Sequence, residues 1–179
     1  KNNSDIFSTY TVKFVEIPEP KSFDGMTSIQ VANAEASDEP QAASHGYYRW
    51  CVLDNDINSR WTAQGGGNWI LLELEEETTV DNLMIAFYNP TKKERGTYFG
   101  INVSADGENW ELVWSGTSDK KAQNGTYQQY ELGGKTAKYI RLDCNGNTSQ
   151  GITAGWNNIA EIVVTKKDTE PSVTATPEP

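Results

Sequence analysis

The strongest constraint on the fold is a series of short apolar and aromatic runs that recur between polar, turn-forming segments. No stretch keeps the period of 3.6 residues that an amphipathic helix requires. Short strands at such a spacing favour a sandwich or a barrel, so the sequence predicts an all-β fold of one of these two kinds. The predicted strands cover residues 69–74, 83–88, 99–103, 110–114, 127–132, 139–142 and 159–164.

The connections and the ends of the chain define the domain boundaries. Asp106-Gly107 predicts a tight hairpin, because glycine readily takes the positive φ of such a turn. Residues 10–17 and 29–34 are further strand candidates, and the polar segment before Gly46 has room for one helical turn. The Pro- and Thr-rich end is typical of an extended linker. We therefore expect a lead-in over 1–28, a sandwich over 29–166 and a linker over 167–179, as one monomeric module of a larger secreted chain.

Charge and composition exclude several kinds of partner. The net charge is −10 and the isoelectric point about 4.6, which disfavours nucleic acid and anionic membranes, because both are bound through clustered cations. It also removes long-range attraction for polyanions such as pectin or alginate, although a local arginine can still bind one carboxylate. No apolar run approaches the roughly 20 residues of a membrane span, so we expect no membrane insertion.

Two cysteines, Cys51 and Cys144, lie far apart in the sequence. They are not in a C-x-x-C arrangement, which argues against a thiolate zinc site. They form either one disulfide or two buried free thiols. The extracellular character of the C-terminal segment favours the disulfide.

The segment 52–61 concentrates hard oxygen donors in a short loop. Asp54, Asp56, Asn58 and Ser59 are spaced as in loops that fold around a hard cation. The same residue types are also the commonest turn formers, because their side chains bond the local backbone. From the residues alone, a cation site and an ordinary turn both remain open.

Recognition of a sugar is better supported than catalysis. The single histidine, His45, has no paired nucleophile motif, and the run of Glu73 and Glu75–Glu77 marks a solvated strand end rather than a glycosidase carboxylate pair. Sugars pack their C–H faces on aromatic rings and bond planar polar groups at their edges. The loops 61–68, 88–98 and 145–158 carry both, although solvated loops are commonly polar for no other reason.

Several motifs, in order, carry a family resemblance. They are Val52-Leu-Asp-Asn-Asp-Ile-Asn-Ser-Arg-Trp61, Gly67-Asn-Trp-Ile70, Ile85-Ala-Phe-Tyr-Asn89, Val103-Ser-Ala-Asp-Gly-Glu-Asn-Trp110, Ala137-Lys-Tyr-Ile-Arg141 and Trp156-Asn-Asn-Ile-Ala-Glu-Ile162. Over residues 29–165 the chain resembles discoidin or coagulation-factor type C domains. More narrowly, it is similar to the family 32 carbohydrate-binding modules attached to bacterial polysaccharide lyases and glycoside hydrolases.

The resemblance implies a jelly-roll-like, discoidin-type β-sandwich of two antiparallel sheets with one structural Ca²⁺. A cation that ties an early loop to the last strand would act on stability rather than on catalysis. The family often has Gly and Thr where this chain has Asn55 and Ser59, a departure that keeps the oxygens. The implied donors are the side chains of Asp54, Asp56, Ser59 and Glu161 and the carbonyls of Val52 and Ala160.

The resemblance also implies a ligand site for a polysaccharide or oligosaccharide at one end of the sandwich. We therefore expect a non-catalytic, extracellular module that tethers its parent protein to a plant or microbial polysaccharide. The alternative is a structural, adhesion or sensor ectodomain that binds protein, and an independent hydrolase or lyase ranks third. The implied ligand residues are Arg95, Asn147 and Trp156, with Tyr88, Tyr98 and Asn157 nearby.

Overall fold

A computed structural model describes residues 17–91 and 93–168. Nearly all of the strand expected over 10–17, and most of the expected linker, lie outside these residues. The elements are β1 (Met26–Ile29), β2 (Val31–Ala36), α1 (Ala42–His45), the 3-10 helix η1 (Arg49–Leu53), β3 (Trp61–Gln64), β4 (Asn68–Phe87), β5 (Thr97–Ser104), β6 (Glu111–Thr117), β7 (Tyr127–Asn147), α2 (Gly151–Ala154) and β8 (Trp156–Lys167). Among the described residues, no helix is long and apolar enough to cross a membrane.

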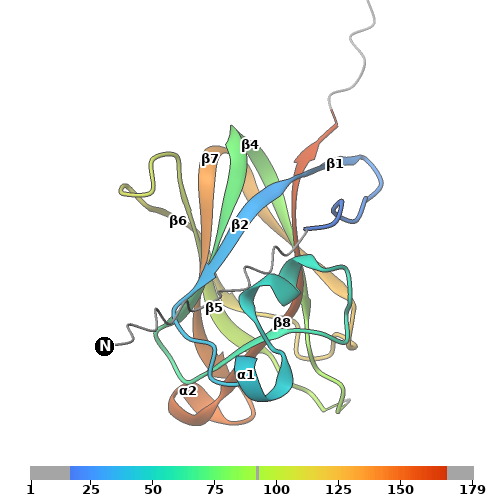
Figure 1. Ribbon diagram of the computed structural model, residues 1–179, viewed down its shortest axis with the longest axis vertical. Coiled ribbons are helices and arrows are strands. Elements are labelled where there is room, and N and C mark those ends of the chain that lie inside the picture. Colours follow the sequence, from blue (N-terminus) through green and yellow to red (C-terminus); the bar gives the residue numbers. More distant parts are fainter. Residues whose placement is uncertain (1–16, 92, 169–179) are drawn as a thin grey trace, which may run out of the picture.

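Two long strands, β4 and β7, build both layers of the sandwich (Figure 1). The first part of β4 pairs with β2 and with the end of β7. The end of β7 pairs in turn with β5, and β5 pairs with β6. The second part of β4 pairs with β8 and with the start of β7, and β8 carries β1 and β3 at its two ends. Register shifts between Glu73 and Thr78, and between Val80 and Asn82, mark the passage from one layer to the other. All these pairings are antiparallel, so the predicted all-β sandwich is confirmed.

The core lies between the two layers and follows the strand period of two. On β4, Ile70, Leu72 and Leu74 are fully buried, while the residues between them are partly exposed. An aromatic group closes the core near β5 and β6: the Phe99 ring lies 4.6 Å from that of Trp114 and 5.1 Å from that of Tyr130. Large rings therefore supply much of the burial in a chain with only 36% apolar residues.

Local features follow the sequence where turn chemistry decides them. The Asp106-Gly107 hairpin joins β5 to β6, with Gly107 at φ 79° and Asp106 accepting bonds from the backbone of Glu108 and Asn109. The single helical turn before Gly46 is α1. The runs expected at 69–74 and 83–88 are parts of one strand, β4, and those at 127–132 and 139–142 are parts of β7.

Five connections meet at one end of the sandwich, the end that carries α1 and α2 in Figure 1. These are the segments 37–48, 54–60, 88–96, 118–126 and 148–155. Backbone bonds tie them together: Arg95 N–H donates to the Lys120 carbonyl at 3.0 Å, and Thr148 N–H donates to the Gly96 carbonyl at 2.9 Å. We call this set of segments the loop end.

The two cysteines are free and buried, so the interpretation that favoured a disulfide is wrong. Cys51 lies in η1, and its thiol donates to the Gly46 carbonyl at 3.3 Å. Cys144 lies in β7, fully enclosed by the core. Burial raises the pKa of both thiols above the ordinary range.

We predict that both thiols resist alkylation in the native protein. Because the thiolate is the reactive form and both groups are enclosed, labelling by iodoacetamide at pH 8 should be more than about tenfold slower than for an exposed cysteine. In denaturant without reductant, mass spectrometry should detect two labels. If labelling in denaturant requires a reductant, the cysteines are bonded and this description is wrong.

Candidate functional site

The loop 54–60 is folded by its own carboxylates. Asp54 accepts a bond from the Asp56 amide at 2.9 Å, and Asp56 accepts one from the Asn58 amide, also at 2.9 Å. Asn55 takes a positive φ of 61°, a conformation that asparagine tolerates better than most residues. The turn interpretation of this loop is therefore correct, but it does not account for all of its oxygens.

Several oxygens crowd around the Ser59 hydroxyl. Its Oγ lies 2.8 and 3.0 Å from the two Asp54 carboxylate oxygens, 3.0 Å from the Asp56 carbonyl and 3.2 Å from the Cys51 carbonyl. One hydroxyl proton cannot satisfy all of these acceptors. Such a group of hard oxygens has the composition of a calcium ligand shell.

Glu161 brings a second carboxylate to this place from the last strand. The residue is 1% exposed, and its Oε1 has no hydrogen-bond partner among the described residues. Burial and the neighbouring Asp54 carboxyl raise the pKa of Glu161 to about 9, against the effect of the Asp56 and Asn55 amides. A buried, unpartnered carboxylate oxygen is costly unless a proton or a cation satisfies it.

A β-bulge in β8 sets the position of Glu161. Ile159 pairs with Phe87 and Glu161 with Ala86, so Ala160 is an extra residue between two consecutive partners. Bulges often redirect a side chain next to a functional site. The bulge thus takes Ala160 out of the regular pairing beside the oxygen cluster.

The structure brings together Asp54, Ser59 and Glu161, as the resemblance implies. Two details differ from the expected donor set. The Asp56 carboxylate is engaged by Asn58, so its carbonyl faces the cluster instead, and the carbonyl next to Ser59 is that of Cys51 rather than Val52. Within residues 17–91 and 93–168, no three His, Cys, Asp or Glu side chains form a metal cluster. A cation here would rely on two carboxylates, a hydroxyl and carbonyls, which fit Ca²⁺ better than a transition metal.

Next to the oxygen cluster, Arg60 lies between two aromatic rings. Its guanidinium carbon is 3.7 Å from the centre of the Tyr47 ring and 3.9 Å from that of the Tyr88 ring. The His45 ring stacks with Tyr47 at 5.3 Å. Arg60 Nε is buried without a hydrogen-bond partner among the described residues. Two rings thus fix the guanidinium plane, and no carboxylate in the described part of the chain forms a salt bridge with it.

Arg95 adds a second cation at the same place. Its Nη2 donates to the Tyr88 carbonyl at 2.6 Å, which joins it to the Tyr47–Arg60–Tyr88 stack. Burial and the nearby Arg60 charge lower the pKa of Arg95. Neither arginine forms a salt bridge within the described part of the chain. Two guanidinium groups held close together without an anion between them favour an anionic or strongly polar ligand.

The other expected ligand residues fall into two groups, one fully buried and one partly exposed. Asn147 and Asn157 are fully buried, and their amides bond the chain itself: Asn147 to Trp156 and the 149–150 turn, Asn157 to Gly146, Ala63 and Gly65. Their assignment as ligand contacts is therefore corrected, because neither side chain reaches the surface. Trp156 and Tyr98 are partly exposed at the starts of β8 and β5.

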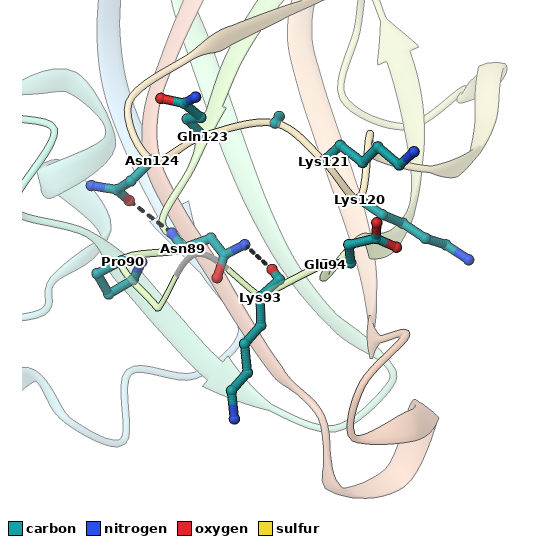
Figure 2. A pocket seen from close by; sticks show the side chains of 9 residues that line it. Asn89, Pro90, Lys93, Glu94, Lys120, Lys121, Gln123 and Asn124 are labelled. Atoms are coloured by element: carbon teal, nitrogen blue, oxygen red, sulfur yellow. Dashed lines mark hydrogen bonds between the residues drawn. The ribbon is translucent and has the colours of Figure 1, made fainter.

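Sequence reasoning did not select Tyr47, Arg60 or a pocket that lies beside Arg95. Arg60 lies in the loop immediately before the buried Trp61, where no local pattern indicates its two aromatic neighbours. The pocket lies between the segments 88–96 and 118–126 and is lined by asparagines and lysines (Figure 2). Its two walls are distant in sequence, and no local pattern connects them.

Several solved structures of carbohydrate-binding modules are similar to this chain. The truncated AlyQ with CBM32 and alginate lyase domains matches with 28% identity and a TM-score of 0.69; the match covers 81% of this chain but only 34% of that protein. The CBM32 of AlyQ in complex with 4,5-unsaturated mannuronic acid has 28% identity and a TM-score of 0.66, covering 77% of this chain and 97% of that one. A pectin-binding carbohydrate-binding module has 29% identity and a TM-score of 0.66, covering 83% and 96%.

A family model also matches directly. The F5/8 type C domain model aligns with residues 31–162, which is most of the chain and nearly all of the sandwich. The same residues contain the oxygen cluster, the arginine pair and both buried asparagines. The chain therefore belongs to the F5/8 type C, or discoidin, domain family, with carbohydrate-binding modules as its structural neighbours.

Proposed function

We propose that this chain is a non-catalytic carbohydrate-binding module whose loop end holds a polysaccharide. The observation that carries the proposal is the Arg60 guanidinium, fixed between Tyr47 and Tyr88 and left without an acidic partner among the described residues. Aromatic rings and planar donors are the groups that bind sugar faces and edges. Relatives that bind 4,5-unsaturated mannuronic acid and pectin support the proposal.

The role we propose is proximity. A weakly binding module raises the local concentration of an attached domain at its substrate. One relative joins a CBM32 to an alginate lyase domain, which supports such a place in an extracellular, multi-modular protein. The buried carboxylate of Glu161 lies against that of the partly buried Asp54 rather than across an open cleft from it, so the two suit a structural site better than a glycosidase pair.

We further propose that Ca²⁺ occupies the oxygen cluster and stabilises the fold. Asp54, Ser59 and Glu161 would hold it with the carbonyls of Cys51 and Asp56, and Ala160 lies in the adjacent bulge. The bound cation would neutralise the buried Glu161 carboxylate and the partly buried Asp54 carboxylate, which otherwise repel each other. This would join the segment 54–59 to the last strand, far along the chain.

Substitution of either arginine should weaken the binding of a glycan. Arg60→Ala and Arg95→Ala should each weaken binding of the preferred glycan at least about tenfold, because each removes a charge-assisted donor. Calorimetric titration against galactose-type, pectic, alginate and xylan oligosaccharides measures this effect. Arg141→Ala is the matched control: Arg141 stacks on Trp110 at 4.7 Å and pairs with Asp143, and its loss should leave affinity unchanged.

Two outcomes would count against the ligand proposal. Equal affinity in all three variants would place the sugar elsewhere on the module. A folded protein that binds none of these glycans would favour the structural, adhesion or sensor role instead. Thermal melting of each variant separates loss of binding from loss of folding.

Bound calcium should raise the thermal stability of the protein. At calcium concentrations about a hundredfold above Kd, the melting temperature should exceed that in chelator by about 5–10 °C, since binding to the native state alone stabilises it. Asp54→Asn should abolish this difference, because it removes a charged donor from the cluster. Asp143→Asn, which removes a carboxylate distant from the cluster in sequence, should retain it. A melting temperature that is the same with calcium and with chelator in the unmodified protein would refute the cation site.

A further inference from the structure

A basic pocket continues the arginine site along the loop end. It has a volume of about 470 Å³ and lies between the segments 88–96 and 118–126. Figure 2 shows Lys93 extending from the first segment, and Lys120 and Lys121 extending together from the second. Glu94 is the one acidic residue among those that line the pocket. Three lysines and one glutamate therefore line the pocket, and its lining carries a net positive charge.

The walls of this pocket are held by internal bonds. The Asn89 amide N–H donates to Asn124 Oδ1 at 2.7 Å, and its side-chain Nδ2 donates to the Lys93 carbonyl at 2.8 Å (Figure 2). Asn89 is only 6% exposed. The Arg95 amide bonds the Lys120 carbonyl from the opposite segment. These bonds hold the backbone at Asn89, Lys93 and Lys120, while the side chains of Lys93, Lys120 and Lys121 remain exposed to solvent.

The pocket and the arginine stack are built in part by consecutive residues of one segment. Asn89 follows Tyr88, whose ring covers Arg60 and whose carbonyl accepts the Arg95 bond. A ligand that contacts the arginines can therefore extend into the pocket without crossing the molecule. An oligosaccharide, with charged groups repeated along a chain, has the shape for such a pair of subsites.

Several cations lie close together at the loop end of a chain that is acidic as a whole. The chain carries a net charge of −10, yet five cations gather at the loop end: Arg60, Arg95, Lys93, Lys120 and Lys121. None of them forms a salt bridge with any described residue, whereas Lys135 and Lys138 on the sheet both do. The same segments also carry six acidic residues, so the excess of positive charge is confined to the pocket, where three lysines line the space with one glutamate. Such a local excess of cations attracts anions even on an acidic protein.

We infer that the ligand is an acidic polysaccharide built from uronate sugars, with one carboxylate at the Arg60–Arg95 pair and the next in the lysine pocket. This inference rests on the proposed carbohydrate-binding function and specifies its ligand class. Arginine binds a carboxylate through two parallel bonds, while lysine acts as a mobile point charge. The arginine pair would therefore fix one sugar, and the lysines would accommodate its neighbour. The overall negative charge does not prevent this, because the attraction is local.

The test compares two lysine pairs that are alike in sequence but lie at opposite ends of the sandwich. Lys120→Gln/Lys121→Gln removes two charges at the pocket, and Lys166→Gln/Lys167→Gln removes two at the far end of β8. Calorimetry would use galacturonate and mannuronate oligosaccharides and their carboxyl-reduced counterparts, at several salt concentrations. The pocket variant should bind the better uronate ligand about fivefold to tenfold more weakly and show a smaller dependence on salt. The control pair should change affinity less than about twofold.

The outcomes separate this inference from the function on which it rests. Carboxyl-reduced oligosaccharides that bind as tightly as the uronates, in a manner that requires Arg95, would overturn the uronate assignment and leave the carbohydrate-binding function intact. Equal loss of affinity in both lysine variants would also overturn it, because only net charge would then matter. Absence of binding to every glycan, charged or neutral, would overturn both. Loss confined to the pocket variant and to uronate ligands supports the inference.

Discussion

The buried carboxylate of Glu161 is the constraint on which the rest of the structure depends. It lies on the last strand, beside Asp54 of an early loop, and its Oε1 has no partner among the described residues. Two carboxyl groups in such a place require a proton or a cation between them. Ser59 belongs to the same oxygen cluster, and Arg60 is the next residue in the chain. The proton or cation that satisfies the Glu161 carboxylate therefore also helps to fix the position of Arg60.

Stability and recognition therefore depend on adjacent parts of one loop. The oxygens of Asp54, Ser59 and Asp56 turn inward, while the Arg60 guanidinium lies between Tyr47 and Tyr88. The loop can be held rigidly by buried groups and still present a cation to a ligand. A preorganised site loses less conformational entropy on binding, which matters for a module that relies on few contacts.

Much of the fold could be predicted from the sequence because local patterns specify it. Apolar runs located the strands, and the Asp106-Gly107 turn located one hairpin. The sequence did not reveal that two pairs of runs merge into β4 and β7, because a strand that bends between layers has no separate local signature. In the same way, residue type alone did not distinguish a buried amide such as Asn157 from a ligand-binding one.

The candidate site was predictable only in part. Asp54, Ser59 and Glu161 follow from a motif, and Arg95 with Tyr88 from a loop rich in donors. The lysine pocket is formed by residues about 30 positions apart in sequence. The net charge of −10 gives no indication that cations lie together there. Composition averages over the whole surface, whereas a ligand responds to the field at one end.

We propose that the loop end binds an acidic glycan through the arginine pair. The most direct test of this proposal is an NMR titration that follows the Nε–H signals of the arginines as a uronate oligosaccharide is added. We predict large, saturable shifts for Arg60 and Arg95, with those of Arg141 unchanged. Shifts confined to Arg141, or none at any arginine when binding is otherwise detected, would contradict the account.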